Sequence, residues 1–148
     1  MSQSIVVVGG GFAGLWAALA AARHLDLLGV TNQQVRVTLI NRDPWHCIRV
    51  RNYEADISGA RLPLAELLEP AGVQLIVGDV AGIDLERRVV SIERERKGER
   101  VPYDRLVLAA GSKLARPAIP GLAEHAFAID TWNEAAALQA HVRALRCR

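Results

Sequence analysis

The sequence predicts an α/β fold in which a parallel sheet is joined by a small antiparallel β-meander. Three observations favour it: a β-branched run that ends in a glycine cluster, a helical pattern directly after the glycines, and short strand-like segments late in the chain. At 148 residues with 51% hydrophobic content, the chain has the size of one domain with a packed core.

The N-terminal segment is expected to form a βαβ unit. Residues 4–8 are a β-branched run suited to a buried parallel strand. Residues 12–28 follow as a helix, and Gly29 stands where a C-terminal cap belongs. The apolar residues expected on its buried face lie at helical spacing, at positions 12, 15, 16, 19, 22 and 25. Residues 35–40 are a second strand.

The middle of the chain carries the expected meander. Residues 45–60 have no clear period and are expected to be loop with some helix, whereas residues 62–68 form a short helix that Pro70 ends. Four strand-like segments follow, and the last three make the meander: residues 74–77, 80–85, 88–93 and 100–103. The densest charge run, residues 93–100, alternates in sign and is expected at a solvated hairpin tip.

The C-terminal third begins with a further strand. Residues 106–109 are apolar enough for a buried strand, and a loop with two prolines follows at residues 111–121. Residues 126–129 are expected as a last strand. Thr131 and Glu134 have the spacing of a capping box, which predicts a final helix to about residue 145.

The glycine cluster needs a physical use, because a glycine inside an element costs roughly 0.5–1 kcal/mol relative to alanine. The uncharged residues 5–22 have the length of a membrane or signal segment, but the absence of Lys and Arg before them and the glycines within them disfavour that interpretation. A plain strand-to-helix turn without a ligand is a second interpretation. The third is a dinucleotide fingerprint: Gly9 allows the sharp turn, Gly11 lets a pyrophosphate approach, and Gly14 lets the helix pack closely.

A dinucleotide site also needs a group for the ribose hydroxyls at the end of the second strand, usually Asp or Glu. Asn41 stands there, and its amide can donate and accept hydrogen bonds without a charge. Asp43 is the nearest carboxylate that could substitute. Because Asn41 followed by Arg42 also suits a 2′-phosphate, an NADP-binding Rossmann domain is an alternative.

Composition disfavours several other functions. Eighteen basic and sixteen acidic residues are scattered without a basic stripe, so no nucleic acid is expected as a partner. Cys47 and Cys147 are far apart in sequence, and neither has a second Cys or His at metal-ligand spacing. We therefore expect no metal site, no structural disulfide and a cytoplasmic location.

Four motifs together resemble the N-terminal, FAD-binding portion of flavoproteins with two dinucleotide-binding domains, the pyridine nucleotide-disulfide oxidoreductase superfamily. They occur in the family's order, as IVVVGGGFAGL, VTLINRD, VGDVAGIDLERRVV and YDRLVLAAGS. Within the superfamily the chain looks most like the type II NADH dehydrogenases, which are FAD-containing NADH:quinone oxidoreductases. The resemblance implies a Rossmann-like FAD-binding fold with a parallel sheet and the small meander, over one domain of residues 1–148.

The resemblance also implies a set of cofactor-binding residues. Those expected at the FAD pyrophosphate are Gly9, Gly11, Phe12, Ala13 and Gly14. Asn41 with Arg42 would take the adenosine ribose, and the backbone of Val80 would contact adenine. Ala110 and Gly111 match the segment that passes close to the cofactor, with Ala in place of the usual Thr. The structural alternatives are an ordinary strand valine for Val80 and a tight turn for the other two.

No catalytic side chain is expected, because the flavin performs the redox chemistry in this family. Cys47 has no partner cysteine at the spacing that dithiol reductases or sulfide:quinone reductases need. His46, Arg49, Arg51 and Tyr53 occupy the segment that approaches the flavin in relatives. The two arginines are expected at the solvated surface, and stabilisation of anionic reduced flavin or of acidic partners is the alternative.

The resemblance implies hydride transfer from NAD(P)H to FAD, followed by reduction of a quinone or another acceptor. Relatives contain a second domain for NADH and C-terminal helices that attach to the membrane, and both are expected to be absent from these 148 residues. Membrane association is therefore expected only through segments absent here, and the chain alone is expected not to be competent. A truncated, non-catalytic fragment that binds no cofactor is a further alternative.

Overall fold

The computed structural model describes residues 2–94 and 97–146. Contacts divide the chain into two compact units. The first contains Met1–His46 and Pro63–Gly111, and the second contains Cys47–Leu62 and Ser112–Arg148. The chain passes between them at β3 (Trp45–Cys47), at β4 (Arg61–Pro63) and after Gly111. The sequence did not predict the two short strands β3 and β4.

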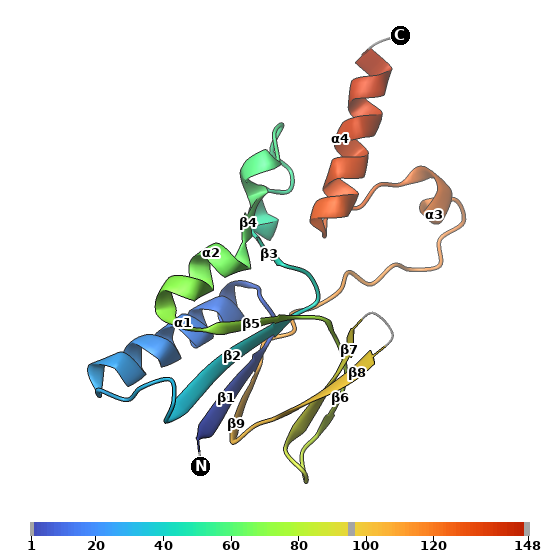
Figure 1. Cartoon of the computed structure of the whole chain (residues 1–148). Coiled ribbons are helices and arrows are strands. Elements are labelled where there is room, and N and C mark those ends of the chain that lie inside the picture. Colours follow the sequence, from blue (N-terminus) through green and yellow to red (C-terminus); the bar gives the residue numbers. More distant parts are fainter. Residues whose placement is uncertain (1, 95–96, 147–148) are drawn as a thin grey trace. The chain divides into compact units, whose positions relative to one another are not determined.

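A four-stranded parallel sheet with the strand order β5-β2-β1-β9 forms the centre of the first unit (Figure 1). Its strands are β1 (Gln3–Val8), β2 (Val35–Asn41), β5 (Gln74–Val77) and β9 (Arg105–Leu108). From β1 the chain builds the sheet to one side through β2 and β5, and then returns to the other side of β1 as β9. The predicted parallel sheet is confirmed, with strand ends that differ by a residue or two.

Each face of this sheet has its own core, because successive side chains of a strand point to opposite faces. Val7 packs on the helical side against Leu15 of α1 (Phe12–Leu27) and against α2 (Leu64–Leu68). Val6 and Val8 point the other way. Burial on both faces explains the unbroken β-branched run of β1.

The opposite face is covered by the antiparallel meander, whose strands are β6 (Asp79–Asp84), β7 (Val89–Arg94) and β8 (Lys97–Pro102). The prediction of this meander is confirmed. The expected charged hairpin tip falls on residues 95–96, which lie outside the described residues. The first unit therefore has three layers, namely helices, parallel sheet and meander.

Helix α1 ends as predicted and buries most of the expected face, except at its first turns. Gly29 has a positive φ of 68°, and the N–H groups of Gly29 and Val30 reach back to the carbonyls of Asp26 and Leu25, which is a Schellman cap. The expected burial of Phe12 and Trp16 was wrong, because these side chains are 49% and 66% exposed. Its fully buried residues are Gly14, Leu15 and Ala18, and the expected residues Leu19, Ala22 and Leu25 are half-buried against the same core.

In its described residues, the second unit contains three short helical segments and one longer helix. They are η1 (Arg49–Arg51), η2 (Ser58–Ala60), α3 (Leu122–His125) and α4 (Trp132–Arg146). The capping box is confirmed, because Thr131 Oγ1 accepts the Glu134 N–H and the Glu134 carboxylate accepts the Thr131 N–H. The expected strand at residues 126–129 was wrong, since no strand is assigned there. The Ile129 carbonyl instead accepts a hydrogen bond from the Asn52 side chain.

The predicted helix at residues 62–68 was wrong at its start and correct at its end. Leu62 belongs to β4, and α2 begins at Leu64. Pro70 then lies in the 3₁₀ turn η3 (Glu69–Ala71). Among the residues that the structure describes, none of the helices has both the length and the apolar character needed to cross a membrane.

Candidate functional site

Two turns meet at the carboxyl ends of the neighbouring strands β1 and β9 of the first unit. The turn after β1 contains Gly9, and the turn after β9 contains Ala109 and Ala110. A Cβ on Gly9 would overlap the Ala109 carbonyl and lie 3.2 Å from the Ala110 Cα. The strand order reverses between β1 and β9, and α/β proteins bind ligands at such a reversal.

The turn from β1 into α1 depends on two close backbone approaches. Gly9 has φ 109°, a conformation that side chains other than glycine rarely adopt. A Cβ on Gly14 would overlap the Gly9 carbonyl oxygen and lie 2.9 Å from its carbonyl carbon. The predicted sharp turn and close helix packing are therefore present at these two glycines.

Gly11 differs from both, because a Cβ there would meet no protein atom within 4 Å. Gly11 is the N-cap of α1 and provides no capping side chain, and the first helical hydrogen bond runs from the Leu15 N–H to the Gly11 carbonyl. The N–H groups of a helix's first turn have no partner within the helix, and they lie at its positive end. Exposed backbone around Gly11, Phe12 and Ala13 could thus hold an anionic group such as a phosphate.

Gly10 is a part of the turn that sequence reasoning did not single out. Its N–H donates to Asn41 Oδ1 at 2.8 Å, and its carbonyl oxygen lies 2.8 Å from His46 Nδ1. A carbonyl can only accept, so Nδ1 carries the proton of this hydrogen bond. A Cβ on Gly10 would lie 2.8 Å from both Asn41 Cγ and Leu64 Cδ1. Side chains from three elements therefore enclose this glycine.

Asn41 lies at the end of β2, as predicted, with its side chain directed at the glycine turn. Its Nδ2 donates to the Asp43 backbone carbonyl at 2.8 Å, while its Oδ1 receives the Gly10 N–H. The amide thus links the end of β2 to the turn after β1. The tertiary structure makes this contact between residues 31 positions apart in sequence.

The other predicted residues lie at neighbouring strand ends. Arg42 Nε lies 2.8 Å from Asp79 Oδ1 at the start of β6, and both side chains are exposed. Val80 follows Asp79, pairs with Ile92 and packs its half-buried side chain against the meander core. Gly111 has φ 71° and leaves open space at its Cβ position.

In the second unit, both arginines of the expected flavin-approaching segment have carboxylate partners. Arg49 pairs with Asp130, and Arg51 holds both oxygens of Glu54 at 2.8 Å. The hydrogen bond from Arg51 lowers the pKa of the Glu54 carboxyl. Tyr53 is exposed. The two arginines are partly exposed, in agreement with the surface interpretation.

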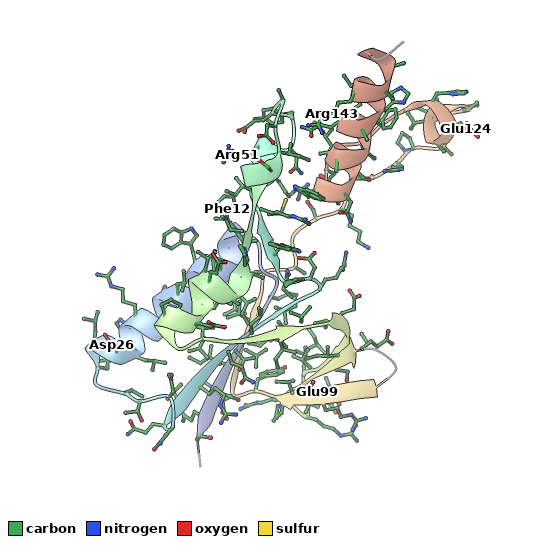
Figure 2. All side chains as sticks on the ribbon, turned by 45° about the horizontal axis from the view of Figure 1, so that its top comes forward. Phe12, Asp26, Arg51, Glu99, Glu124 and Arg143 are labelled. Carbon is green, nitrogen blue, oxygen red and sulfur yellow. The ribbon has the colours of Figure 1, made fainter. Side chains whose placement is uncertain are left out.

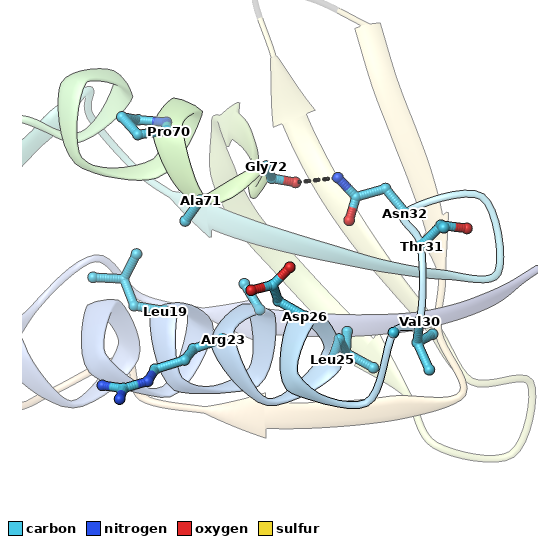
Figure 3. A pocket seen from close by; sticks show the side chains of 12 residues that line it. Leu19, Arg23, Leu25, Asp26, Val30, Thr31, Asn32, Pro70, Ala71 and Gly72 are labelled. Carbon is cyan, nitrogen blue, oxygen red and sulfur yellow. Dashed lines mark hydrogen bonds between the residues drawn. The ribbon is translucent and has the colours of Figure 1, made fainter.

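Two cavities lie away from the glycine turn. One of about 670 Å³ is lined by the second half of α1 and by the segments that precede β2 and β5, so it lies at the amino ends of the strands (Figure 3). There Asn32 Nδ2 donates to the Gly72 carbonyl at 3.2 Å. The other, of about 240 Å³, lies in the second unit between Leu114 and Ala128. In the part of the chain that the structure describes, no three His, Cys, Asp or Glu side chains are grouped as a metal site.

The parallel sheet, its reversed strand order and the glycine turn define a Rossmann-like α/β fold. The chain belongs to the pyridine nucleotide-disulphide oxidoreductase family, whose sequence profile matches residues 3–147. The predicted superfamily is thereby confirmed.

Relatives within this family include NADH dehydrogenases. An NADH dehydrogenase-like protein of Mycobacterium tuberculosis is 50% identical over 141 residues, which are 95% of this chain and 34% of the relative. A type II NADH:quinone oxidoreductase of the same organism is 29% identical, over 74% of this chain and 23% of its own length. The predicted resemblance to type II NADH dehydrogenases is confirmed, and the chain spans about a third or less of these relatives.

A solved structure shows the same fold. The sulfide:quinone oxidoreductase from Aquifex aeolicus matches with a TM-score of 0.79 and 25% identity. The match covers 99% of this chain and 33% of that protein. The α/β fold predicted from the sequence is thus shared with this sulfide:quinone oxidoreductase.

Proposed function

We propose that residues 1–148 are the FAD-binding part of an oxidoreductase that passes electrons from NAD(P)H through flavin to a quinone or another acceptor. The open space at Gly11 carries this proposal, because it lies at the uncapped start of α1 where the strand order reverses. A pyrophosphate needs both that room and unpaired N–H groups. The residues at the start of α1 therefore fit the pyrophosphate of FAD.

Each predicted residue has a place in this proposal. The backbone from Gly11 to Gly14 would hold the pyrophosphate, and the turn at Ala110 and Gly111 would flank it. Asn41 and Arg42 would lie at the adenosine ribose, and the Val80 backbone at adenine. The close contact of Gly9 with Gly14 supports the role of the turn, because it keeps the start of α1 directed at the strand ends.

When bound, the flavin supplies the redox chemistry, accepting a hydride and passing its electrons on. The chain's own residues are proposed to bind and orient, and we assign no acid, base or nucleophile among them. Positive charge at the start of α1 would offset the charge of the phosphates.

An NADP site is the less favoured alternative. Arg42 would be the residue for a 2′-phosphate, but its guanidinium already pairs with the Asp79 carboxylate. A phosphate placed beside Asp79 would meet a like charge, which disfavours binding. The arrangement therefore supports an adenosine ribose without a 2′-phosphate, as in FAD.

Substrates and location of the whole protein are proposed from the relatives. The names of the matched proteins include NADH and quinone, which supports these two as the partners of a protein that contains this chain. The sequence has only two cysteines, 100 positions apart, which supports the reducing cytoplasmic location that we propose.

Visible absorbance tests the proposed function. The purified 148-residue chain is measured before and after FAD is added and unbound flavin is removed, and the released cofactor is identified. We expect one FAD per chain with a protein-perturbed flavin spectrum. A folded chain that retains no FAD would overturn the proposal, and a melting temperature raised by NADP but not by FAD would favour the alternative.

A further inference from the structure

His46 is a buried polar side chain for which the proposed redox chemistry has no use. It lies in β3, is 3% exposed, and directs Nδ1–H at the Gly10 carbonyl oxygen over 2.8 Å. A buried imidazole is costly unless its polar atoms are paired. The pairing here is with the backbone of the glycine turn, 36 positions earlier in the chain.

The hydrogen bond from His46 to the Gly10 carbonyl also fixes the direction of the Gly11 N–H. The described backbone has no cis peptides, so the peptide that joins Gly10 to Gly11 is trans. In a trans peptide the C=O and N–H point in opposite directions. Holding the Gly10 oxygen at His46 therefore directs the Gly11 N–H away from His46. That N–H belongs to the residue whose Cβ position is open.

Without such a hold the turn would be poorly ordered. The turn contains three consecutive glycines, Gly9 to Gly11. Glycine has more backbone freedom than any other residue type. Asn41 fixes the preceding peptide through the Gly10 N–H, and His46 fixes the following one. A flipped Gly10–Gly11 peptide would present an oxygen, rather than an N–H, to an anion. A turn held before binding loses less entropy when the ligand arrives.

We propose that His46 is a positioning residue for the dinucleotide, acting through the Gly10 carbonyl to present the Gly11 N–H to the pyrophosphate. This inference rests on the proposed FAD-binding function. His46 also contacts the Phe12 ring edge-to-face, with the ring centroids 4.9 Å apart. The hydrogen bond and the ring contact therefore have to be separated by experiment.

Two substitutions separate them. His46→Phe keeps an aromatic ring beside Phe12 but removes the donor. His46→Asn removes the ring but keeps an N–H at the same distance from the backbone as Nδ1. The exposed His24, near the end of α1, provides the matched control His24→Phe.

FAD dissociation constants are measured by flavin fluorescence for these variants, together with their thermal midpoints. We expect His46→Phe to weaken FAD binding about tenfold or more, because the hydrogen bond that orders the glycine turn is lost. His46→Asn should stay within about threefold of wild type even if its thermal midpoint falls, because the donor is retained. His24→Phe should bind as wild type does. Rescue by Asn is a readout that a merely structural role would not produce.

The possible failures are distinguishable. If wild type binds no FAD, the proposed function fails and this inference fails with it. If wild type binds FAD and His46→Phe binds equally well, the positioning role is overturned while the proposed function stands. If His46→Phe does not fold, His46→Gln takes its place, because its donor lies one bond farther from the backbone. A folded His46→Gln that binds FAD as tightly as wild type would contradict the proposal. A folded His46→Asn that no longer binds FAD would contradict it as well.

Discussion

Gly14 and Gly9 are in contact across the turn from β1 to α1, so closely that a Cβ on Gly14 would overlap the Gly9 carbonyl. This contact places the start of the helix against the end of the strand. It also rotates α1 so that Gly14, Leu15 and Ala18 face the sheet, while Phe12 and Trp16 remain exposed. Figure 2 shows Phe12 at the start of this helix.

Gly14→Ala should destabilise the chain by about 1–3 kcal/mol, because the added methyl group has no room and the opposing atoms are backbone. Chemical denaturation measures this loss. Gly82→Ala is the matched control, since a Cβ there meets nothing within 4 Å, and it should change stability by less than about 0.5 kcal/mol. Equal stability of Gly14→Ala and wild type would contradict the described packing.

Gly11→Val should leave the fold intact and abolish FAD binding. The Gly11 backbone has φ −72° and ψ −174°, an extended conformation that valine adopts readily, and no protein atom obstructs a Cβ. The isopropyl group would occupy the space proposed for the pyrophosphate. Circular dichroism reports the fold and retained flavin reports binding. Unchanged FAD occupancy in this variant would refute the fingerprint interpretation of the turn.

Asp79→Asn should improve binding of nucleotides that carry a 2′-phosphate. Removal of the carboxylate frees Arg42 and removes a like charge. Because both side chains are exposed, the expected change is small, about three- to fivefold in the ratio of affinities for 2′,5′-ADP and 5′-AMP. Calorimetry at low salt measures this ratio. Arg42→Gln should shift the ratio in the opposite direction, and a ratio that neither variant changes would place the ribose elsewhere.

Stability of the α4 start should depend on pH through Glu134. Hydrogen bonds from Thr131 and the ion pair with Arg116 lower the pKa of this carboxyl. A lowered folded-state pKa gives stability that is complete above the ordinary glutamate value of about 4.3 and is lost as pH falls through the folded-state pKa. The thermal midpoints of wild type and Glu134→Gln should therefore converge between about pH 5 and pH 3. A difference that stays constant over this range would contradict the role of the charge.

Local sequence patterns were sufficient for the main elements. The β-branched run of β1, the cap at Gly29 and the box of Thr131 and Glu134 each depend on residues close in sequence, and all three are present. The expected strand at residues 126–129 failed for the opposite reason, because a strand needs a distant partner. The short strands β3 and β4 were missed for the same reason.

Within the candidate site, sequence reasoning found the turn but not what holds it. Gly9, Gly11 and Gly14 were found from their spacing, and the close contacts at Gly9 and Gly14 agree with the sharp turn and helix packing expected there. No spacing rule connects His46 to Gly10, since the hydrogen bond exists only once β3 lies beside the turn. The same is true of Arg42 and Asp79, which come together because the end of β2 lies near the start of β6.

The sequence by itself determined the α/β class and the position of the glycine turn, because hydrophobic period and glycine spacing act over a few residues. The resemblance of its four motifs to known flavoproteins indicated the family. Only the tertiary structure decided that Asn41 and His46 hold Gly10 from either side, and that Phe12 and Trp16 stay exposed. The physical reason is the separation in sequence over which each kind of interaction acts. Propensity and capping are local, whereas side-chain hydrogen bonds and burial depend on segments that folding brings together from distant parts of the chain.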